Sequence, residues 1–224
     1  MTGPAARRGG GVESLYPFLY SGASDLDAVL AEVQRSTTEK AAEIVAVREA
    51  MVTRYGGQLA ACATAMAESF AAGGWLYAFG NGGSSTDAEA LVQLFVNPGP
   101  GARPLPAAAL TTDVAVLTAL SNDVGFEVIF ARPLAAKAKP GDIAVGLSTS
   151  GGSANVLRAF EEAQRLGMVT VGFAGYDGGK MAEAGTIDYL FSVPSTSVHR
   201  IQETQATSYD VLWELTQRAL GDRP

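Results

Sequence analysis

Apolar residues divide the chain into a helical N-terminal part and a longer part where strand and helix patterns alternate. Short apolar runs rich in β-branched and aromatic residues predict five strands, at 75–79, 106–110, 142–147, 169–173 and 189–193. Segments of helix-forming composition follow at 86–95, 113–120, 123–137, 153–166 and 199–220. This alternation predicts a mainly parallel sheet with right-handed crossovers, which is a doubly wound α/β fold flanked by helices.

Two helices are predicted before the first strand, at 38–55 and 58–70. Gly56 and Gly57 separate them, so we expect an N-terminal helical hairpin with small, alanine-rich packing faces. The first residues are rich in Gly, Ala and Arg, which is typical of disorder. The expected division is a disordered tail, a helical segment that packs on the core or on another subunit, and an α/β domain, at 1–14, 15–74 and 75–224.

Charge and cysteine content exclude several classes of function. The chain of 224 residues carries a formal net charge of −7 and no large cluster of Lys or Arg, which argues against nucleic-acid binding. Cys62 is the only cysteine, so no disulfide can form within the chain, and this fits a reducing compartment. No apolar run reaches transmembrane length. We therefore expect a cytoplasmic protein without membrane partners.

A glycine-rich turn at residues 80–85, here called the glycine turn, follows the first predicted strand. It contains Asn81, Gly82 and Ser84 and leads into a predicted helix. The first N–H groups of a helix lack internal partners and favour an anion, and glycine lets the backbone approach a ligand closely. The glycine turn therefore indicates a phosphate site. An ordinary turn with a Ser or Thr helix cap remains an alternative.

A second turn of this kind follows the strand at 142–147. The serine turn, residues 148–153, reads Ser-Thr-Ser-Gly-Gly-Ser and leads into another predicted helix. A helix cap needs only one hydroxyl, whereas this turn offers four. Hydroxyl and amide donors at the carboxyl end of a parallel strand favour phosphate binding, although a serine-rich structural turn remains possible.

Together the two turns resemble the SIS (sugar isomerase) domain, and within it the phosphoheptose isomerase group. The resemblance covers about Ile44 to Leu220, and it includes shorter matches at Asp113, 121–126, 178–182 and 200–203. It implies a five-stranded parallel sheet and a homotetramer with active sites between subunits, acting on a phosphorylated heptose or ketose. It also implies phosphate binding by Ser84, Ser148, Thr149, Ser150 and Ser153, and sugar contacts by Asn81, Gly82, Asp113 and Gln202.

The chain departs from the family where the chemistry is expected. The family has a zinc-binding His and, four residues later, a proton-transferring Glu, and these positions are Ala90 and Leu94 here. A second family His corresponds to Asp210. Alanine and leucine can neither bind a metal ion nor transfer a proton. We therefore expect no zinc site and no other cofactor.

Two other residues are candidates for proton transfer. Asp210 lies on the last predicted helix near Gln202, and a desolvated Asp can act as a base. His199, the only histidine, stands just before the Arg-Ile-Gln motif and has an ordinary pKa suited to proton transfer. A solvated or salt-bridged Asp210 and a capping or interface role for His199 remain open. Glu89 and Gln93 are expected to face away from the site.

Three hypotheses about function follow. The first is an aldose–ketose isomerase that uses reassigned catalytic groups. The second is a non-catalytic protein that binds a sugar phosphate to regulate or scaffold a partner. The third is a nucleotide-binding protein, which the loose Gly80-X-Gly82-X-X-Ser85 pattern supports less well because a second serine-rich turn is not part of that scheme.

Overall fold

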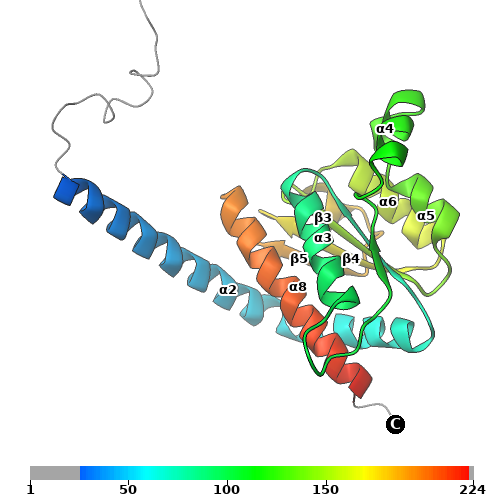
Figure 1. The fold of residues 1–224 in the computed structure, drawn as a ribbon, viewed down its shortest axis with the longest axis horizontal. Helices are drawn as coiled ribbons and strands as arrows, with labels where there is room; N and C mark the ends of the chain where they lie inside the picture. The colour runs from blue at the N-terminus through cyan, green and yellow to red at the C-terminus, as the bar shows by residue number, and fades with distance from the viewer. Residues whose placement is uncertain (1–25, 222–224) are drawn as a thin grey trace, which may run out of the picture. The chain divides into compact units, whose positions relative to one another are not determined.

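The computed structural model describes residues 26–221 and contains one five-stranded parallel sheet (Figure 1). The strands lie in the order β2-β1-β3-β4-β5, and every adjacent pair is parallel. The predicted sheet is confirmed, with strand bounds close to those expected. They are β1 (Leu76–Gly80), β2 (Ala107–Ala109), β3 (Ile143–Ser148), β4 (Val169–Gly175) and β5 (Tyr189–Val193).

Helices connect the strands as the alternating pattern predicts. Those after β1 are α3 (Gly83–Val96), α4 (Val114–Asp123), the 3-10 helix η2 (Phe126–Val128), α5 (Ala131–Lys137), α6 (Ala154–Arg165), α7 (Gly179–Glu183) and α8 (Val198–Gly221). Side chains alternate across each strand, so one apolar set faces each side of the sheet. Ala78, Val145 and Phe173 belong to one core, whereas Phe79 and Ala144 belong to the other.

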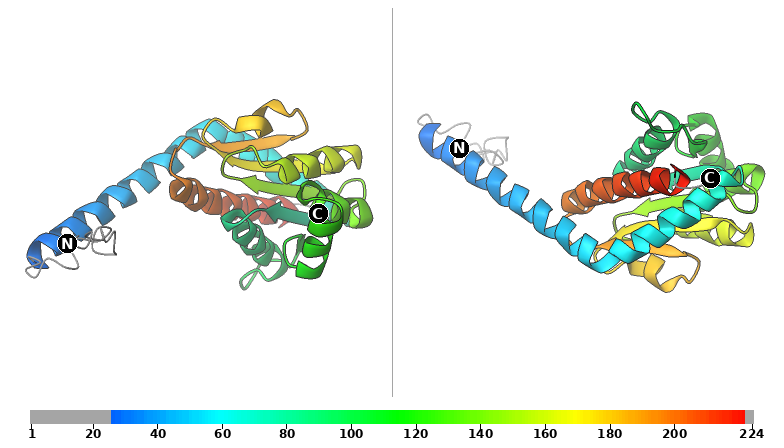
Figure 2. Two further views of the ribbon diagram at one scale, coloured as in Figure 1. Left: turned by 90° about the horizontal axis from the view of Figure 1, so that it is seen from above. Right: turned by 90° about the horizontal axis from the view of Figure 1, so that it is seen from below.

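The helices divide between the two faces of the sheet (Figures 1 and 2). One core is completed by side chains from α3, α8 and the part of α2 (Leu26–Ala71) that follows Ile44. The other is completed by Ile129 and Phe130, which follow η2, and by α5, α6 and α7, with α4 at its margin. This division follows from right-handed crossovers. The chain moves along the sheet in one direction from β1 to β2 and in the other direction from β3 to β5, so the connecting helices lie on opposite faces.

The predicted N-terminal hairpin is wrong, because α2 is one continuous helix of 46 residues. Gly56 and Gly57 lie inside it. A glycine in a helix costs about 1 kcal/mol relative to alanine, which burial of neighbouring side chains can offset. Tyr55 and Leu59 on either side are both buried, and the Tyr55 hydroxyl accepts a hydrogen bond from the backbone N–H of Ser192.

Two compact units divide the chain inside α2, the first ending at Glu43 and the second beginning at Ile44. In the first unit, residues 27–43 of α2 are almost entirely solvent-exposed. The expected tail at 1–14 and the beginning of the segment at 15–74 lie outside the described residues, and the domain boundary at residue 75 stays a prediction. Across residues 26–221, no helix combines the length and apolarity needed to cross a bilayer.

Candidate functional site

The glycine turn and the serine turn lie side by side at the carboxyl ends of β1 and β3. These strands are neighbours in the sheet, yet the chain leaves β1 toward β2 on one side and leaves β3 toward β4 on the other. Connections that diverge in this way leave a crevice between the two strand ends, and ligands of open parallel sheets bind there. The strand order therefore brings both predicted phosphate turns to one place.

The hydroxyl groups of the serine turn converge on Ser148. Its Oγ lies 3.0 Å from Ser153 Oγ and 3.5 Å from Ser150 Oγ, and Ser148 is buried at the end of β3. Ser153 is the N-cap residue of α6, but its hydroxyl makes no capping hydrogen bond. The simple capping role considered for this turn is therefore absent, and the hydroxyls stand beside a helix N-terminus whose dipole favours an anion.

The loop at residues 178–182 packs against the serine turn. Gly151 has a φ of +62°, and a Cβ atom there would lie 2.0 Å from the carbonyl oxygen of Gly178. The carbonyl oxygen of Gly151 accepts a hydrogen bond of 2.9 Å from the backbone N–H of Met181. The sequence match at residues 178–182 thus has a structural reason, since only glycine lets these two loops come so close.

Two asparagines join the glycine turn to the serine turn. Asn81 and Asn155 exchange two amide hydrogen bonds of 2.8 Å, and Asn155 is almost fully buried at the start of α6. The predicted sugar contact Asn81 therefore uses one amide donor and its carbonyl oxygen within the protein. Asn155 was missed by sequence reasoning, although its place just after the serine turn was a usable signal.

The helix that begins at the glycine turn also has no side-chain cap. Gly82 is the N-cap residue of α3 with a φ of 55°, and it offers no side chain to the free N–H groups. Ser84 is buried in the first turn of α3, and its backbone N–H donates to the Asn81 carbonyl oxygen at 3.0 Å. The Ser85 N–H likewise donates to the Gly82 backbone carbonyl oxygen at 2.9 Å, so contacts within the turn use these two amides, and anion binding at the glycine turn stays a prediction.

The start of α8 meets the start of α3 around a pocket of about 470 Å³, here called the Gln202 pocket. His199 and Gln202 from α8 line it together with Gly83, Thr86 and Asp87 from α3. The Gln202 side-chain amide donates a hydrogen bond of 3.2 Å to Asp87 Oδ2. Burial raises the pKa of Asp87, and the hydrogen bond from Gln202 lowers it by less.

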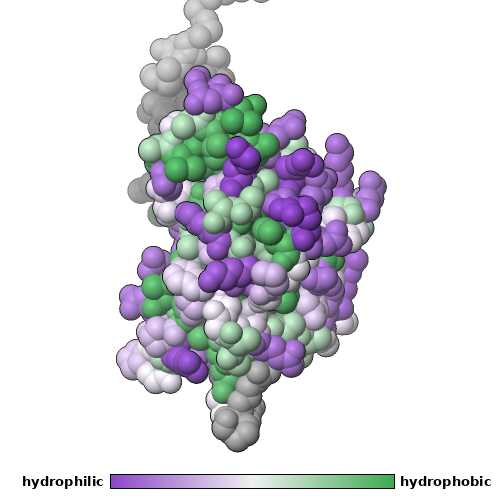
Figure 3. All heavy atoms as spheres, turned by 90° about the vertical axis from the view of Figure 1, so that its right-hand side faces the viewer, coloured by the Kyte–Doolittle hydropathy of each residue, from purple (hydrophilic) through white to green (hydrophobic). Residues whose placement is uncertain are grey.

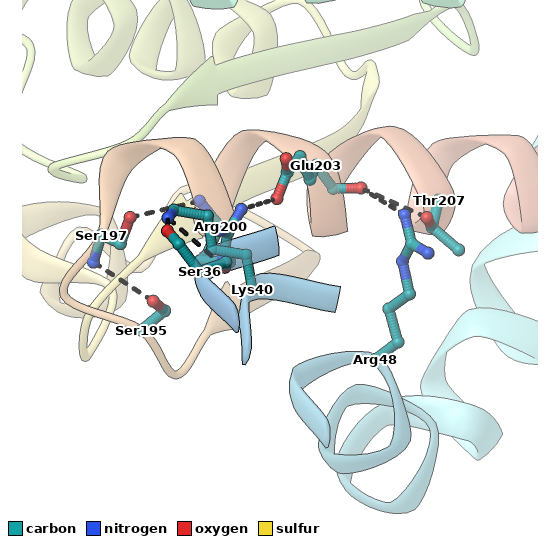
Figure 4. Close-up of polar contacts among 8 residues, drawn as sticks. All are labelled: Ser36, Lys40, Arg48, Ser195, Ser197, Arg200, Glu203 and Thr207. Carbon is teal, nitrogen blue, oxygen red and sulfur yellow. Dashed lines mark hydrogen bonds and ion pairs between the residues drawn. The ribbon is translucent and has the colours of Figure 1, made fainter. Parts of the chain in front are cut away.

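Polar contacts hold the first turns of α8 in place (Figure 4). Glu203 also lines the Gln202 pocket, but its carboxylate is ion-paired with the buried guanidinium of Arg200. The Glu203 carbonyl oxygen accepts a hydrogen bond of 3.4 Å from Arg48 Nη2 on α2. The Glu203 carboxylate is therefore paired with Arg200. Among the described contacts, no cationic side chain forms an ion pair with Asp87, the other carboxylate of this pocket.

A neighbouring pocket of about 380 Å³, the Asp210 pocket, contains the positions at which the sequence is predicted to depart from the family. Ala90 and Leu94 from α3 and Asp210 and Tyr209 from α8 line it, and it shares Ala206 with the Gln202 pocket. Burial, with the nearby carboxylates of Asp87 and Asp210, raises the pKa of Tyr209 to about 12. The phenol therefore stays protonated at neutral pH.

The donor set of the Asp210 pocket does not fit a zinc ion. Zinc sites in proteins use three or four His, Cys or carboxylate ligands, and this pocket supplies one carboxylate beside two apolar side chains. No group of three or more such residues occurs anywhere in the part of the chain that the structure describes. We therefore derive no step through a bound metal ion.

Other predicted residues lie outside the two pockets. The Asp113 carboxylate accepts a hydrogen bond of 3.0 Å from the backbone N–H of Val116 and so caps α4. Glu89 accepts a hydrogen bond of 3.0 Å from Thr111 Oγ1 at the end of β2, and Gln93 is exposed. Thr149 is half-buried in the serine turn. Substrate contacts by Asp113 and Thr149 stay predictions.

Known proteins with a similar sequence or fold are phosphosugar proteins. The SIS domain family matches residues 39–175. A phosphoheptose isomerase of Aquifex aeolicus is 43% identical over 182 residues, which cover 81% of this chain and 94% of the relative. One of Thermodesulfovibrio yellowstonii is 40% identical over 194 residues, covering 86% and 96%. The structure of a phosphoheptose isomerase from Neisseria gonorrhoeae superposes with a TM-score of 0.76 at 31% identity, covering 83% and 99%.

Proposed function

Because the chain belongs to the SIS domain family, we propose that it binds a phosphorylated heptose or ketose and interconverts its aldose and ketose forms. One observation supports the part of this proposal that concerns phosphate binding. The Ser148, Ser150 and Ser153 hydroxyls converge at the N-terminus of α6, and the Ser153 hydroxyl is not used to cap that helix. Such donors bind a phosphate without needing positive charge, which suits a chain whose net charge is −7.

Isomerisation requires a group that removes a proton from the carbon next to a carbonyl and returns it to the adjacent carbon. In this proposal Asp210 is that base, since it lines the same pocket as Ala90 and Leu94, although its side chain is exposed and not desolvated within the single chain. His199 lies exposed in the adjoining Gln202 pocket, eleven residues and about 16 Å along α8 from Asp210, so its part in proton transfer stays a prediction. The protonated Tyr209 phenol, whose ring lies edge-on to Phe173, offers a further hydrogen-bond donor beside Asp210.

A second candidate function is sugar-phosphate binding without turnover, in a regulatory or scaffolding role. The apolar Ala90 and Leu94 side chains in the Asp210 pocket favour it, because they contribute no group for proton transfer. The serine turn and glycine turn serve such a protein equally well.

Incubation with sedoheptulose 7-phosphate, with and without added zinc, separates these candidates. An isomerase produces the aldose form, and Asp210→Asn abolishes this turnover while Glu89→Gln, whose side chain bonds Thr111, leaves it. A thermal shift with sedoheptulose 7-phosphate but no product supports the binding protein. Failure to bind the sugar phosphate contradicts both, and a dinucleotide retained through purification supports a nucleotide-binding protein instead.

A further inference from the structure

The side-chain amide of Gln202 is confined between α8 and the start of α3. It packs directly on Gly83, where an added Cβ atom would lie 2.2 Å from Gln202 Nε2. One turn further along α3, Asp87 Oδ2 accepts the hydrogen bond from the same nitrogen atom at 3.2 Å. Glycine at position 83 therefore makes room for the amide, and Asp87 contacts it from the next turn of the helix.

An ionised carboxylate can only accept hydrogen bonds, whereas an amide has one donating end and one accepting end. Asp87 thus selects the amide orientation in which Nε2 points toward the carboxylate. Gln202 Oε1 then points the other way. This atom accepts no hydrogen bond from the described residues, and it is not among the polar atoms buried without a partner. Gln202 Oε1 is therefore open to the Gln202 pocket.

We propose that Asp87 is a positioning residue that holds the Gln202 amide with Oε1 facing the pocket, where Oε1 accepts a hydrogen bond from a hydroxyl group of the sugar. This inference rests on the proposed binding of a phosphorylated sugar. The phosphate needs donors, which the serine turn and the helix N-termini provide. A sugar hydroxyl also needs an acceptor, and an oriented amide oxygen distinguishes a sugar phosphate from inorganic phosphate.

Calorimetric titration with two ligands tests the proposal. The Asp87→Asn variant can pair with Gln202 in either amide orientation, so its affinity for sedoheptulose 7-phosphate falls about tenfold, the loss of one hydrogen bond. Its affinity for inorganic phosphate stays within about twofold of the wild type. An equal loss for both ligands shows that Asp87 only supports the structure of α3, and no loss for either shows that it does not orient Gln202. Both results overturn the inference.

A double variant provides the decisive comparison. In Gln202→Glu alone, two carboxylates face each other, and sedoheptulose 7-phosphate binds weakly. In Asp87→Asn/Gln202→Glu, the new amide donates to the new carboxylate, whose second oxygen faces the pocket as an acceptor. The double variant is expected to bind the sugar phosphate at least about fivefold more tightly than Gln202→Glu alone, which is a clear departure from additivity. Additive losses overturn the inference.

Glu161→Gln is the matched control, because Glu161 is an exposed residue on α6 whose carboxylate bonds Arg158. It is expected to leave both affinities unchanged. Wild-type protein that binds inorganic phosphate but not sedoheptulose 7-phosphate overturns the proposed function and this inference with it. Wild-type protein that binds both, with an unchanged Asp87→Asn variant, overturns this inference alone.

Discussion

At the scale of single residues, the serine turn brings three hydroxyl groups together. Ser148, Ser150 and Ser153 come together at a helix N-terminus, and the N-cap Ser153 leaves its ordinary capping role unused. A capping hydroxyl contributes to stability, whereas a hydroxyl held for a ligand contributes to binding. Truncating Ser153 therefore separates the two roles.

Ser153→Ala is expected to lower the affinity for sedoheptulose 7-phosphate at least about tenfold, because a hydrogen bond to a charged group contributes roughly 1.5–3 kcal/mol. The melting temperature should change little. Ser121→Ala, which removes a hydroxyl bonded within α4, serves as the control for titration and calorimetry. A large fall in melting temperature with unchanged affinity would mean that Ser153 is a structural residue.

The stability of the folded protein depends on pH in part through the Asp87 carboxyl group. Because burial raises the pKa of Asp87, the folded protein binds this proton more tightly than the unfolded chain does. Stability from this group is therefore fully present below the unfolded pKa and is lost as pH rises toward the folded pKa. Charge on Asp87 at neutral pH therefore lowers the stability of the folded protein.

Asp87→Asn should raise the melting temperature at pH 7, where the wild-type carboxylate is charged. Near about pH 3 the substitution should change the melting temperature little, because the wild-type carboxyl group and the substituted amide are both neutral there. Differential scanning calorimetry across this pH range measures the difference, with Glu161→Gln as the reference. A difference between Asp87→Asn and wild type that is independent of pH would contradict the assignment to the Asp87 proton.

At the scale of elements, α2 continues through two glycines where the sequence predicts a break. Neither Gly56 nor Gly57 would bring an added Cβ atom within 4 Å of another residue, so alanine fits at both positions. Local propensity favours a turn there, but the buried residues on both sides keep the segment helical. The helix therefore depends on packing rather than on its own sequence.

Gly56→Ala and Gly57→Ala are each expected to stabilise the protein by about 0.5–1 kcal/mol, because alanine loses less backbone entropy in a helix. Gly73→Ala is the matched control. It also has open space around its Cα atom, but its φ of +85° makes alanine unfavourable. Urea unfolding measures all three variants, and destabilisation by Gly56→Ala would support the hairpin instead.

The asparagine pair joins two further elements, the end of β1 and the start of α6. Asn155→Ala removes both hydrogen bonds to Asn81 and leaves its amide group without a partner in a half-buried position. We expect a loss of about 1–3 kcal/mol in unfolding free energy, with weaker phosphate binding because the two turns are no longer held together. Asn122→Ala, on exposed α4, should leave both quantities unchanged.

At the scale of the whole molecule, several apolar side chains have no cover within the chain. Val114, Val116, Val124 and Phe126 are exposed on and just after α4, and hydrophobic side chains gather at that end of the surface in Figure 3. Val45 and Val52 are exposed on α2. Exposed apolar groups of this kind favour burial between subunits, while a homotetramer with sites at subunit interfaces stays a prediction.

Light scattering after size exclusion is expected to give the mass of four chains of 23.1 kDa each. Val52→Asp should shift the protein toward smaller species, because a buried unpaired carboxylate is costly, and sugar-phosphate affinity should fall with dissociation. Glu49→Asp, a conservative substitution on the same helix, is the control variant. A monodisperse monomer that binds the sugar phosphate with full affinity would contradict this arrangement.

The sequence alone determined the α/β class, the five strands, and the positions of the glycine turn and the serine turn. These features depend on local signals, namely apolar runs, glycines that permit close approach, and hydroxyls at a helix start. Element bounds near the sheet differ from expectation by a few residues. Most of the candidate phosphate-binding residues lie together because they follow the adjacent strands β1 and β3.

Only the tertiary structure decided the continuity of α2, the pairing of Asn81 with Asn155, and the contact of Gln202 with Asp87. Asp87 and Gln202 are 115 positions apart, and the two asparagines are 74 apart. No local signal links residues at such separations, because their contact depends on strand order and on which helices share a face of the sheet. By contrast, the Asp113 carboxylate caps α4 through a local contact three residues away, and its sugar contact stays a prediction.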